Sequence, residues 1–508
     1  MSRSIVSRMS IAHAILLPMK ALRRIAPFAV IAAAALLLLY SPDIAPERYN
    51  DLATFFRVEM KRQGYSGFSV AAIVDGSVLY VDGFGKDGAG APIRPDTPLY
   101  TPAAAKSMAA LTAYSLARER RLSLDLPVRD YLPWFELAGG KGGDVTVRNL
   151  ISHTSGVADA AFDDSHPAAA DLESAARSIV GALPSAAPGK RFQYMDTDYQ
   201  VLALIIEKVT DRSYASILEN RVFKPLGMKS SSGRALSAPP LGTASFFALP
   251  LTRPAVSSTF GAASGYVVST ASDMGQYMAF LLGPEKFRLG PVPARAVAAL
   301  FEPLVPGAPY GFGFFLGQEK DARVAYHDGS LDGFSSRIVL WPNKKAGVGV
   351  FAAQSSILQS LLALPALTDG ARRIMQEGSA PRPFPLGRLY ILIAVVAVVN
   401  IFALVLQTGG ALRWTKEVRD KAEAKGARGP IRLAVFRCWA GIATRAAIAA
   451  LCPVAVGLAF SRSVSWKVLF QLEPGLAAWC LIACAFGILR NASRLAWIRG
   501  PAGFRRTR

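Results

Sequence analysis

The sequence predicts an α+β domain, an antiparallel sheet with a helical cluster, followed by a C-terminal region of three transmembrane helices. Two observations indicate the domain: β-rich segments stand near its two ends, at residues 65–85 and 335–356, and helical patterns lie between them. Helices gathered between the strands of one mainly antiparallel sheet are typical of the α+β class. A third observation indicates the membrane region: 52% of the 508 residues are hydrophobic, which is high for a soluble protein.

The first expected element is a hairpin. Residues 65–85, "YSGFSVAAIVDGSVLYVDGFG", hold two β-rich runs separated by Asp75 and Gly76, a dipeptide that favours a tight turn. Residues 335–356, "SSRIVLWPNKKAGVGVFAAQSS", give two more strands around a turn at 342–345. The helical patterns between them cover residues 106–118, 147–151, 198–209 and 272–282, with a further amphipathic segment at 213–228.

The apolar excess lies in four runs near the ends of the chain, at residues 26–40, 389–406, 446–460 and 475–489. A membrane span needs about 20 residues, so residues 389–406, where only Asn400 is polar, form the clearest span. The last two runs reach that length only with their flanks, from residue 431 and from residue 468 onward. The alternative for these shorter runs is a buried core helix.

The positive charge is distributed as the positive-inside rule expects for a membrane protein. Residues 1–25 and 407–508 together supply +18 of the net charge of +21, and the middle of the chain is nearly balanced. The loop at 413–432 and the tail at 490–508 are the most basic and are expected in the cytoplasm, which leaves the middle domain outside. Because this charge follows the topology, we expect the lipid bilayer as a partner and no nucleic acid.

The expected organisation has four parts. Residues 1–45 form a basic cytoplasmic start and an apolar run that is either an uncleaved signal anchor or a signal peptide. Residues 46–379 form the exported domain, and residues 380–388 form a Pro-rich tether. Residues 389–508 contain three transmembrane helices with a basic cytoplasmic loop and tail.

The cysteines and histidines indicate neither a metal site nor a cofactor. All four cysteines lie in the expected C-terminal spans, so the exported domain has none and depends on its core rather than on disulfides. Cys480 and Cys484 share one helix face, a spacing that favours packing. With only four histidines in the chain, no Cys/His cluster of the zinc type is present in the sequence.

Eight segments of the exported domain, taken together and in order, resemble one family. They are the opening hairpin and "LSLDLPVRDYLP", "VTVRNLISHTSGV", "PGKRFQYMDTDYQVLALIIEKVT", "PLGM", "GAASGYVVSTASDMGQYM", "YGFGF" and "HDGSLDGFSS". Over about residues 47–375 the chain resembles the β-lactamase-related serine hydrolases, the group of class C β-lactamases and penicillin-binding proteins. The exported domain followed by three spans is similar to a membrane-anchored subset, the prodrug-activating peptidases such as the colibactin peptidase.

The resemblance implies an acyl-enzyme mechanism on an amide or ester. In that mechanism a serine attacks the acyl carbon, and a lysine one helical turn later lies on the same face and accepts the proton. On this basis Lys106 is the expected base, and Tyr194 in "YMD" is the expected proton relay. Asp196 is expected to bind substrate, although the family has asparagine there and a carboxylate cannot donate a hydrogen bond as asparagine does.

The third motif of the family, Lys/His-x-Gly on an edge strand, is matched by "HDG". The resemblance implies that His327 and Gly329 position a small-molecule or peptide substrate. It also implies that the Ser330 N–H and the N–H of the nucleophile position stabilise the oxyanion. The expected location is a bacterial inner (plasma) membrane, with the domain on the periplasmic side. The sequence indicates neither the substrate itself nor the oligomeric state.

The nucleophile is the departure from this pattern. Ala103 stands three residues before Lys106, where the family has serine, and a methyl group cannot attack a carbonyl. No lysine in the chain follows a serine by three residues, and neither Thr101 nor Ser107 has the required helical position. Three explanations stay open: an engineered serine-to-alanine trap, a natural pseudoenzyme that binds an acyl-peptide or cell-wall ligand, and a membrane scaffold. The retained polar residues argue against the scaffold, and the chain as written is expected to be inactive.

Overall fold

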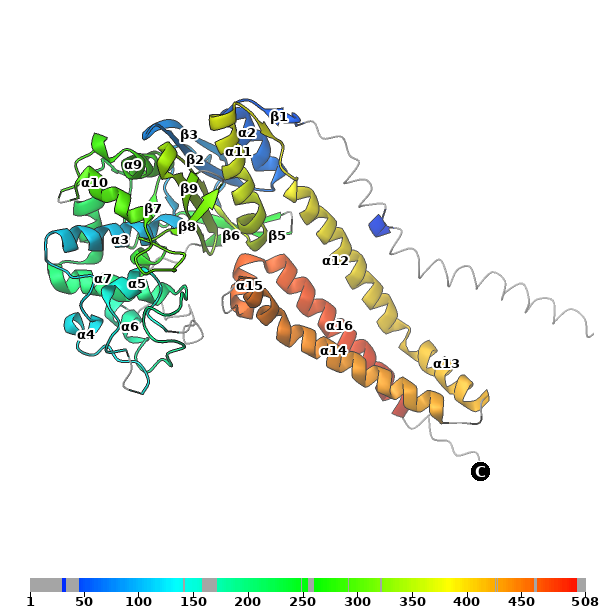
Figure 1. Ribbon diagram of the computed structural model, residues 1–508. Helices are drawn as coiled ribbons and strands as arrows, with labels where there is room; N and C mark the ends of the chain where they lie inside the picture. Colours follow the sequence, from blue (N-terminus) through cyan, green and yellow to red (C-terminus); the bar gives the residue numbers. More distant parts are fainter. Residues whose placement is uncertain are drawn as a thin grey trace, which may run out of the picture. The chain divides into compact units, whose positions relative to one another are not determined.

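A computed structural model describes residues 30–32, 45–139, 142–157, 171–247, 249–254, 260–290, 292–319, 322–424, 426, 428–460 and 464–499. The expected apolar run at residues 26–40 lies almost entirely outside them. The chain divides into two compact units. One consists of Ala45–Gly387 with Gln471–Glu473, and the other contains Arg388–Phe470 and Pro474–Arg508 (Figure 1).

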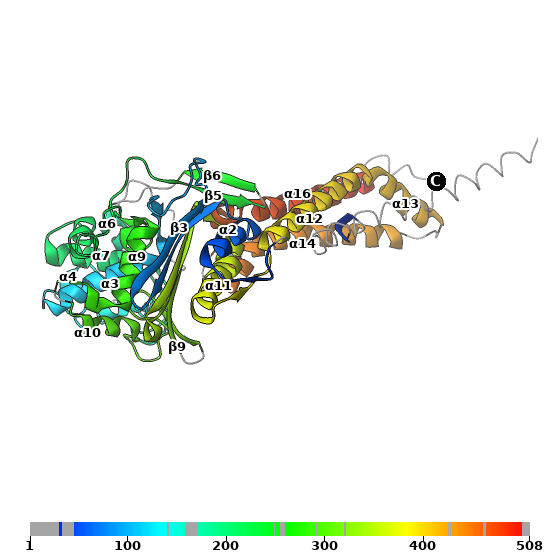
Figure 2. The same cartoon turned by 90° about the horizontal axis from the view of Figure 1, so that it is seen from above.

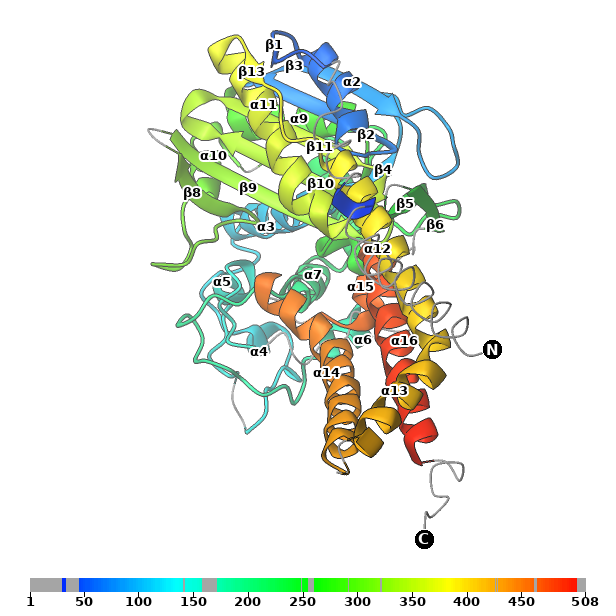
Figure 3. The same cartoon turned by 90° about the vertical axis from the view of Figure 1, so that its right-hand side faces the viewer.

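The first unit is built on a six-stranded antiparallel sheet with the order β3-β2-β11-β10-β9-β8. Both expected strand pairs are present and adjacent in it, and the order from β8 to β11 can be followed in Figure 3. The central strands are almost fully buried, which explains their runs of Val, Ile, Phe and Ala. The strands are β2 (Gly67–Val74), β3 (Ser77–Gly85), β8 (Phe315–Glu319), β9 (Ala322–Leu331), β10 (Phe334–Trp341) and β11 (Ala346–Ala352).

Helices cover both faces of this sheet, so the unit has three layers (Figure 2). On one face lie α2 (Leu52–Arg62) and α11 (Leu364–Glu377). On the other face α3 (Pro102–Arg118) packs on β9 and β10, and α9 (Ala271–Leu282) packs on β2, β3 and β11. This architecture confirms the expected α+β fold. The helical cluster lies between the first and the last strands of the sheet in the sequence, and it packs on one face of the sheet.

The helical cluster extends beyond α3 and supplies its second wall. Helix α7 (Asp196–Thr210) packs against α3, and ten of its residues are buried. The shorter helices are α4 (Val128–Tyr131), α5 (Val147–Ile151), α6 (Leu172–Arg177), α8 (Tyr214–Leu218) and α10 (Ala294–Val297). Three small sheets pair β1 (Arg48–Tyr49) with β13 (Ala380–Pro381), β4 (Leu99–Tyr100) with β7 (Val268–Ser269), and β12 (Gln354–Ser355) with the hairpin β5 (Leu241–Phe246) and β6 (Leu249–Pro254).

The second unit is helical. Among the described residues three helices are long and apolar enough to cross a membrane, over Leu386–Gln407, Gly429–Gly457 and Pro474–Ile498. They belong to α12 (Leu386–Gly409), α14 (Gly429–Phe460) and α16 (Pro474–Arg499), with α13 (Ala411–Ala424) and α15 (Trp466–Leu472) between them.

Two expected boundaries differ from the structure. The last span does not gain its length from residue 468 onward, because α15 ends at Leu472 and a new helix begins at Pro474, a first helical position that proline favours. The span extends instead past residue 489. The segment expected as a Pro-rich tether, residues 380–388, is shorter than those bounds, because residues 380–381 pair with β1 and α12 already begins at Leu386.

Candidate active site

The candidate site begins at the N-terminus of α3. Pro102 occupies the first helical position, where its missing N–H costs no hydrogen bond, and the alanines that follow favour the helix. Ala103 is fully buried, and Lys106, one turn further on, is only 1% exposed. A lysine three residues after Ala103 lies on the same helical face, so the expected pair of positions is formed.

Lys106 is held by two oxygen atoms. Its Nζ donates to Asp196 Oδ1 at 2.5 Å and to the carbonyl oxygen of Ser264 at 2.7 Å, and it lies 4.8 Å from the ring centroid of Tyr194. Burial acts to lower the pKa of Lys106, but the Asp196 carboxylate and the Tyr194 hydroxyl outweigh it and hold the pKa above its ordinary value. At neutral pH the side chain is therefore an ammonium group, which has no lone pair with which to accept a proton.

Tyr194 lies between Lys106 and the third motif. Its hydroxyl is 3.5 Å from His327 Nε2, at the limit of a hydrogen bond, and its ring stacks on Phe315 with centroids 6.0 Å apart. The ring also contacts His153, with centroids 4.5 Å apart. Lys106, the expected base, and His327, the expected substrate-positioning residue, thus both lie near Tyr194, the expected proton relay.

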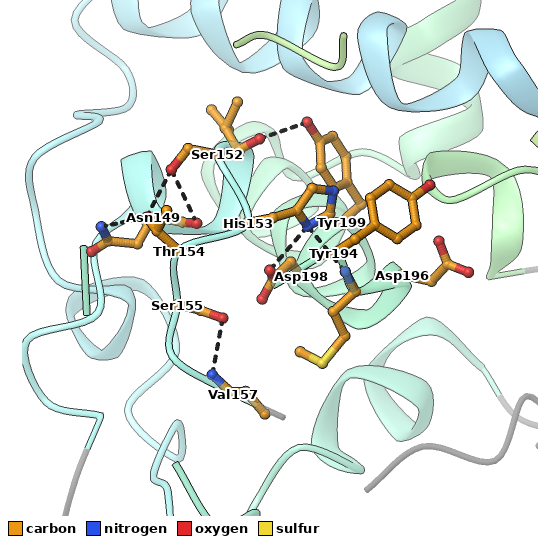
Figure 4. A network of polar contacts seen from close by, with 12 residues as sticks. Asn149, Ser152, His153, Thr154, Ser155, Val157, Tyr194, Asp196, Asp198 and Tyr199 are labelled. Atoms are coloured by element: carbon orange, nitrogen blue, oxygen red, sulfur yellow. Dashed lines mark hydrogen bonds and ion pairs between the residues drawn. The ribbon is translucent and has the colours of Figure 1, made fainter. Parts of the chain in front are cut away.

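His153 fixes the segment that carries Tyr194. Its carbonyl oxygen accepts from the N–H of Gln193 at 2.8 Å, and its Nδ1 accepts from the N–H of Met195 at 3.3 Å, so both neighbours of Tyr194 are tied to one residue. The ring is fully buried and its Nδ1 lies 3.2 Å from Asp198 Oδ2 (Figure 4). In the same view Asp196 lies apart from this pair, so the two carboxylates of the first turn of α7 have different partners.

The "HDG" motif was expected on an edge strand. It lies on β9, and the edge of the sheet is β8. The pairing of β8 with β9 runs only from Ala322 to Tyr326, however, so His327 lies one residue beyond the end of that ladder. Gly329 is required by close packing: a Cβ there would lie 2.4 Å from the Ala103 nitrogen. The glycine therefore lets β9 approach the start of α3, and Ser330 next to it is exposed.

The backbone N–H of Ala103, expected as an oxyanion donor, has an acceptor within the protein. It donates to Ser336 Oγ at 2.9 Å, and Ser336 lies on β10 directly across from Gly329. Neither Ser336 nor the Ser264 carbonyl was identified from the sequence. The "GAASGY" and "HDGSLDGFSS" segments marked their neighbourhoods, but a backbone acceptor and one serine among several carry no sequence signal of their own.

The nearby hydroxyl groups are engaged elsewhere. Thr101 Oγ1 donates to the carbonyl oxygen of Val267 at 3.2 Å. Ser107 Oγ donates to the carbonyl oxygen of Ala104 at 2.8 Å and accepts from Tyr277 Oη at 2.9 Å. Both hydroxyl groups are therefore held by hydrogen bonds to other parts of the protein. In the part of the chain that the structure describes, no group of three or more His, Cys, Asp or Glu side chains is arranged to hold a metal ion.

Comparisons with known proteins place this geometry in context. The family model described as "Beta-lactamase" matches residues 52–367. Among curated proteins, the chain is 26% identical over 319 residues to Protein flp of Staphylococcus aureus (strain MW2), covering 60% of this chain and 63% of that protein. It is 26% identical over 327 residues to the unguisins hydrolase ungD' of Aspergillus campestris, covering 58% and 59%. The chain therefore spans about three fifths of the length of these relatives.

Solved structures show the same fold. The octameric penicillin-binding protein homologue from Pyrococcus abyssi has a TM-score of 0.55 and 25% identity, covering 64% of this chain and 77% of that one. The D-alanine carboxypeptidase AmpC from Burkholderia cenocepacia has a TM-score of 0.53 and 19% identity, covering 64% and 97%. The matched part corresponds to the first unit, which holds every residue of the candidate site.

Proposed function

Because the chain belongs to the beta-lactamase family, whose members are serine hydrolases, we propose that it is an exported, membrane-anchored member in which the acyl-enzyme step is lost. One observation supports this proposal: Ala103 stands one helical turn before Lys106 and against Gly329 of the third motif, the position to which we assign the nucleophile. The site keeps the polar groups for an amide or ester ligand, a small molecule or a peptide. It offers no hydroxyl at the position from which attack would occur.

The Lys106–Asp196 ion pair favours a natural loss over an engineered trap. A trap requires only the change at position 103, whereas Asp196 replaces the family's asparagine and holds Lys106 as an ammonium group. Two residues of the expected catalytic mechanism, Ala103 and Asp196, thus differ from the family pattern. Such a pair of changes is expected when selection for catalytic turnover has ceased. They also support the second candidate function, a pseudoenzyme that binds an acyl-peptide or cell-wall ligand outside the membrane.

The test of the proposed function is covalent labelling. The purified chain is expected to remain unlabelled by β-lactam and fluorophosphonate probes, because a nucleophile is needed both to open the β-lactam ring and to displace fluoride from the phosphorus. Intact mass spectrometry measures the adduct, and Lys106→Ala is the matched control. An adduct that survives Lys106→Ala and maps to another serine would show that the site has been placed wrongly.

The membrane topology has its own test. We expect four crossings, with both termini in the cytoplasm and the first unit outside, because the basic segments alternate with the candidate spans. Alkaline phosphatase fused after Ser461 should be active, and the same reporter fused after Lys421 should be inactive. The reverse pattern would contradict the proposed export of the domain.

A further inference from the structure

The chain that leads from the domain into the first candidate span is fixed to the domain. Gln63 Nε2 donates to the carbonyl oxygen of Phe384 at 2.9 Å, two residues before α12 begins. Gly387, in the first turn of α12, lies so close to the end of α2 that a Cβ on it would be 2.9 Å from the carbonyl oxygen of Arg62. The start of the span therefore belongs to the compact body of the domain.

A buried glutamine cluster, formed by Gln63, Gln354 and Gln359, joins this region to the β5–β6 hairpin. Gln354 Nε2 donates to Ser245 Oγ of β5 at 2.7 Å and to Gln359 Oε1 at 2.9 Å. Gln359 Nε2 donates in turn to the carbonyl oxygens of Gly64 at 2.9 Å and Gln63 at 3.2 Å. These hydrogen bonds hold four segments as one piece: the hairpin, the π-helical residues 359–363 before α11, the end of α2 and the segment before α12.

Large apolar side chains are exposed on this same piece. In the described part of the first unit, nine large apolar side chains are exposed, and five belong to the segments that the glutamine cluster joins. Exposed apolar side chains concentrated on a few segments that are held together favour an interaction surface. We call them the apolar rim: Leu249 (65% exposed) and Leu251 (40%) on β6, Leu361 (51%) and Leu362 (52%) before α11, and Phe384 (62%).

We propose that the apolar rim inserts into the interfacial layer of the lipid bilayer and holds the domain against the membrane surface. This proposal rests on the membrane anchoring proposed above. The span Leu386–Gln407 has 22 residues and is about 33 Å long, close to the ~30 Å thickness of the hydrocarbon core. Its first residue must therefore lie at the boundary of that core, which places Phe384 at the depth where aromatic side chains gather.

The fixed position of residues 384–387 within the domain's own unit is what favours lipid over other occupants. A flexible tether would let the domain move away from the bilayer, but the glutamine cluster and the Gly387 contact keep the rim beside the start of the span. Apolar side chains at that depth are stabilised by the interface, as in proteins that lie on a membrane. A second copy of the chain would cover the same residues, and the experiment separates the two.

The experiment uses the full chain in phosphatidylethanolamine–phosphatidylglycerol vesicles. A diazirine amino acid is placed singly at Leu251, Leu362 or Phe384, each exposed so that the fold is kept, and phospholipid adducts are counted by mass spectrometry after irradiation. Val398 in the span (67% exposed) is the positive control, and Leu183 (78% exposed), in the loop after α6, is the matched negative control. We expect adducts at the rim positions at least fivefold above those at Leu183.

Each other outcome overturns the proposal in a distinguishable way. Rim positions at the Leu183 level, with Val398 strongly labelled, would leave the anchoring intact and refute the docking. Cross-linked dimers without lipid adducts would assign the rim to a second copy. An unlabelled Val398 would refute the anchoring itself, and the docking with it.

Discussion

Replacing Ala103 by serine is expected to give a chain that β-lactam probes acylate and fluorophosphonate probes phosphonylate at the new hydroxyl, at a pH high enough for part of Lys106 to be the free amine. The substitution adds one oxygen atom one helical turn before Lys106, whose Nζ lies over the ring of Tyr194. The Tyr194 hydroxyl in turn lies 3.5 Å from His327 Nε2. Adding Lys106→Ala or Tyr194→Phe should remove nearly all of this labelling, because nucleophile and base act as a unit. In another serine hydrolase the loss of either costs a factor on the order of 10⁶.

The pH dependence of that labelling follows from the Lys106–Asp196 pair. Because Asp196 and Tyr194 hold the pKa of Lys106 above its ordinary value, the free amine forms only as the pH rises, and labelling of Ala103→Ser should increase with pH. Asp196→Asn removes the carboxylate while burial still lowers the lysine pKa, so the double variant should reach the same rate at lower pH. Stopped-flow labelling between pH 6 and about 10 measures both profiles.

One result would favour the second candidate function instead. If Ala103→Ser folds normally but stays unlabelled by β-lactam, ester and D-peptide reagents, the candidate site is not a dormant hydrolase site. Asp196 would then be a ligand contact of a binding protein. In that case Asp196→Ala should bind the ligand more weakly than the unsubstituted chain does.

The second large effect is expected from Gly313→Ala, which should destabilise the domain by about 3 kcal/mol or more. Gly313 has a φ of +84°, and a Cβ there would lie 2.3 Å from both the Cα and the nitrogen of Ser107. Both atoms belong to the backbone of α3, which is buried among other elements and cannot give way. Thermal unfolding of the full chain in detergent, followed by tryptophan fluorescence, should show a clearly lowered midpoint.

Two other glycines separate the contributions. Gly307 has a similar φ of +80° but open space around it, so Gly307→Ala should show only the backbone strain, about 1 kcal/mol. Gly317 has open space and no such φ, so Gly317→Ala should stay within about 0.5 kcal/mol of the unsubstituted chain. Equal midpoints for Gly313→Ala and Gly307→Ala would mean that the close contact with α3 does not exist.

The elements were predictable from the sequence because their signals are local. The turn at Asp75 and Gly76, the strands around it, and the helix that contains Lys106 all follow from patterns within a few residues, and the structure has them. The family resemblance, which the comparisons confirm, placed Tyr194 and His327 near that helix although they are distant in sequence.

What the sequence could not give depends on contacts between distant segments. Asp196 was read as a lost hydrogen-bond donor, and only the structure shows its carboxylate 2.5 Å from Lys106 Nζ. The Ser336 hydroxyl as acceptor for the Ala103 N–H depends on the pairing of β10 with β9 and on the bare Cα of Gly329. Helix α12 begins at Leu386, three residues before the expected start of the span, where Gly387 packs against the end of α2. The sequence of residues 380–388 does not predict this contact.

The pairing of β1 with β13 bears on how the protein is processed. Arg48 lies opposite Pro381 and Tyr49 opposite Ala380, so the first and last strands of the domain meet at one place. A cut in the chain ahead of Ala45 would leave the β1–β13 pair in place, together with the hydrogen bonds from Arg382 to the carbonyl oxygens of Ala45 and Glu47. The domain would stay joined to α12 through residues 382–385 whether or not a protease removes the N-terminal apolar run. If the domain is anchored as proposed, maturation at that end and retention at the membrane would be independent events.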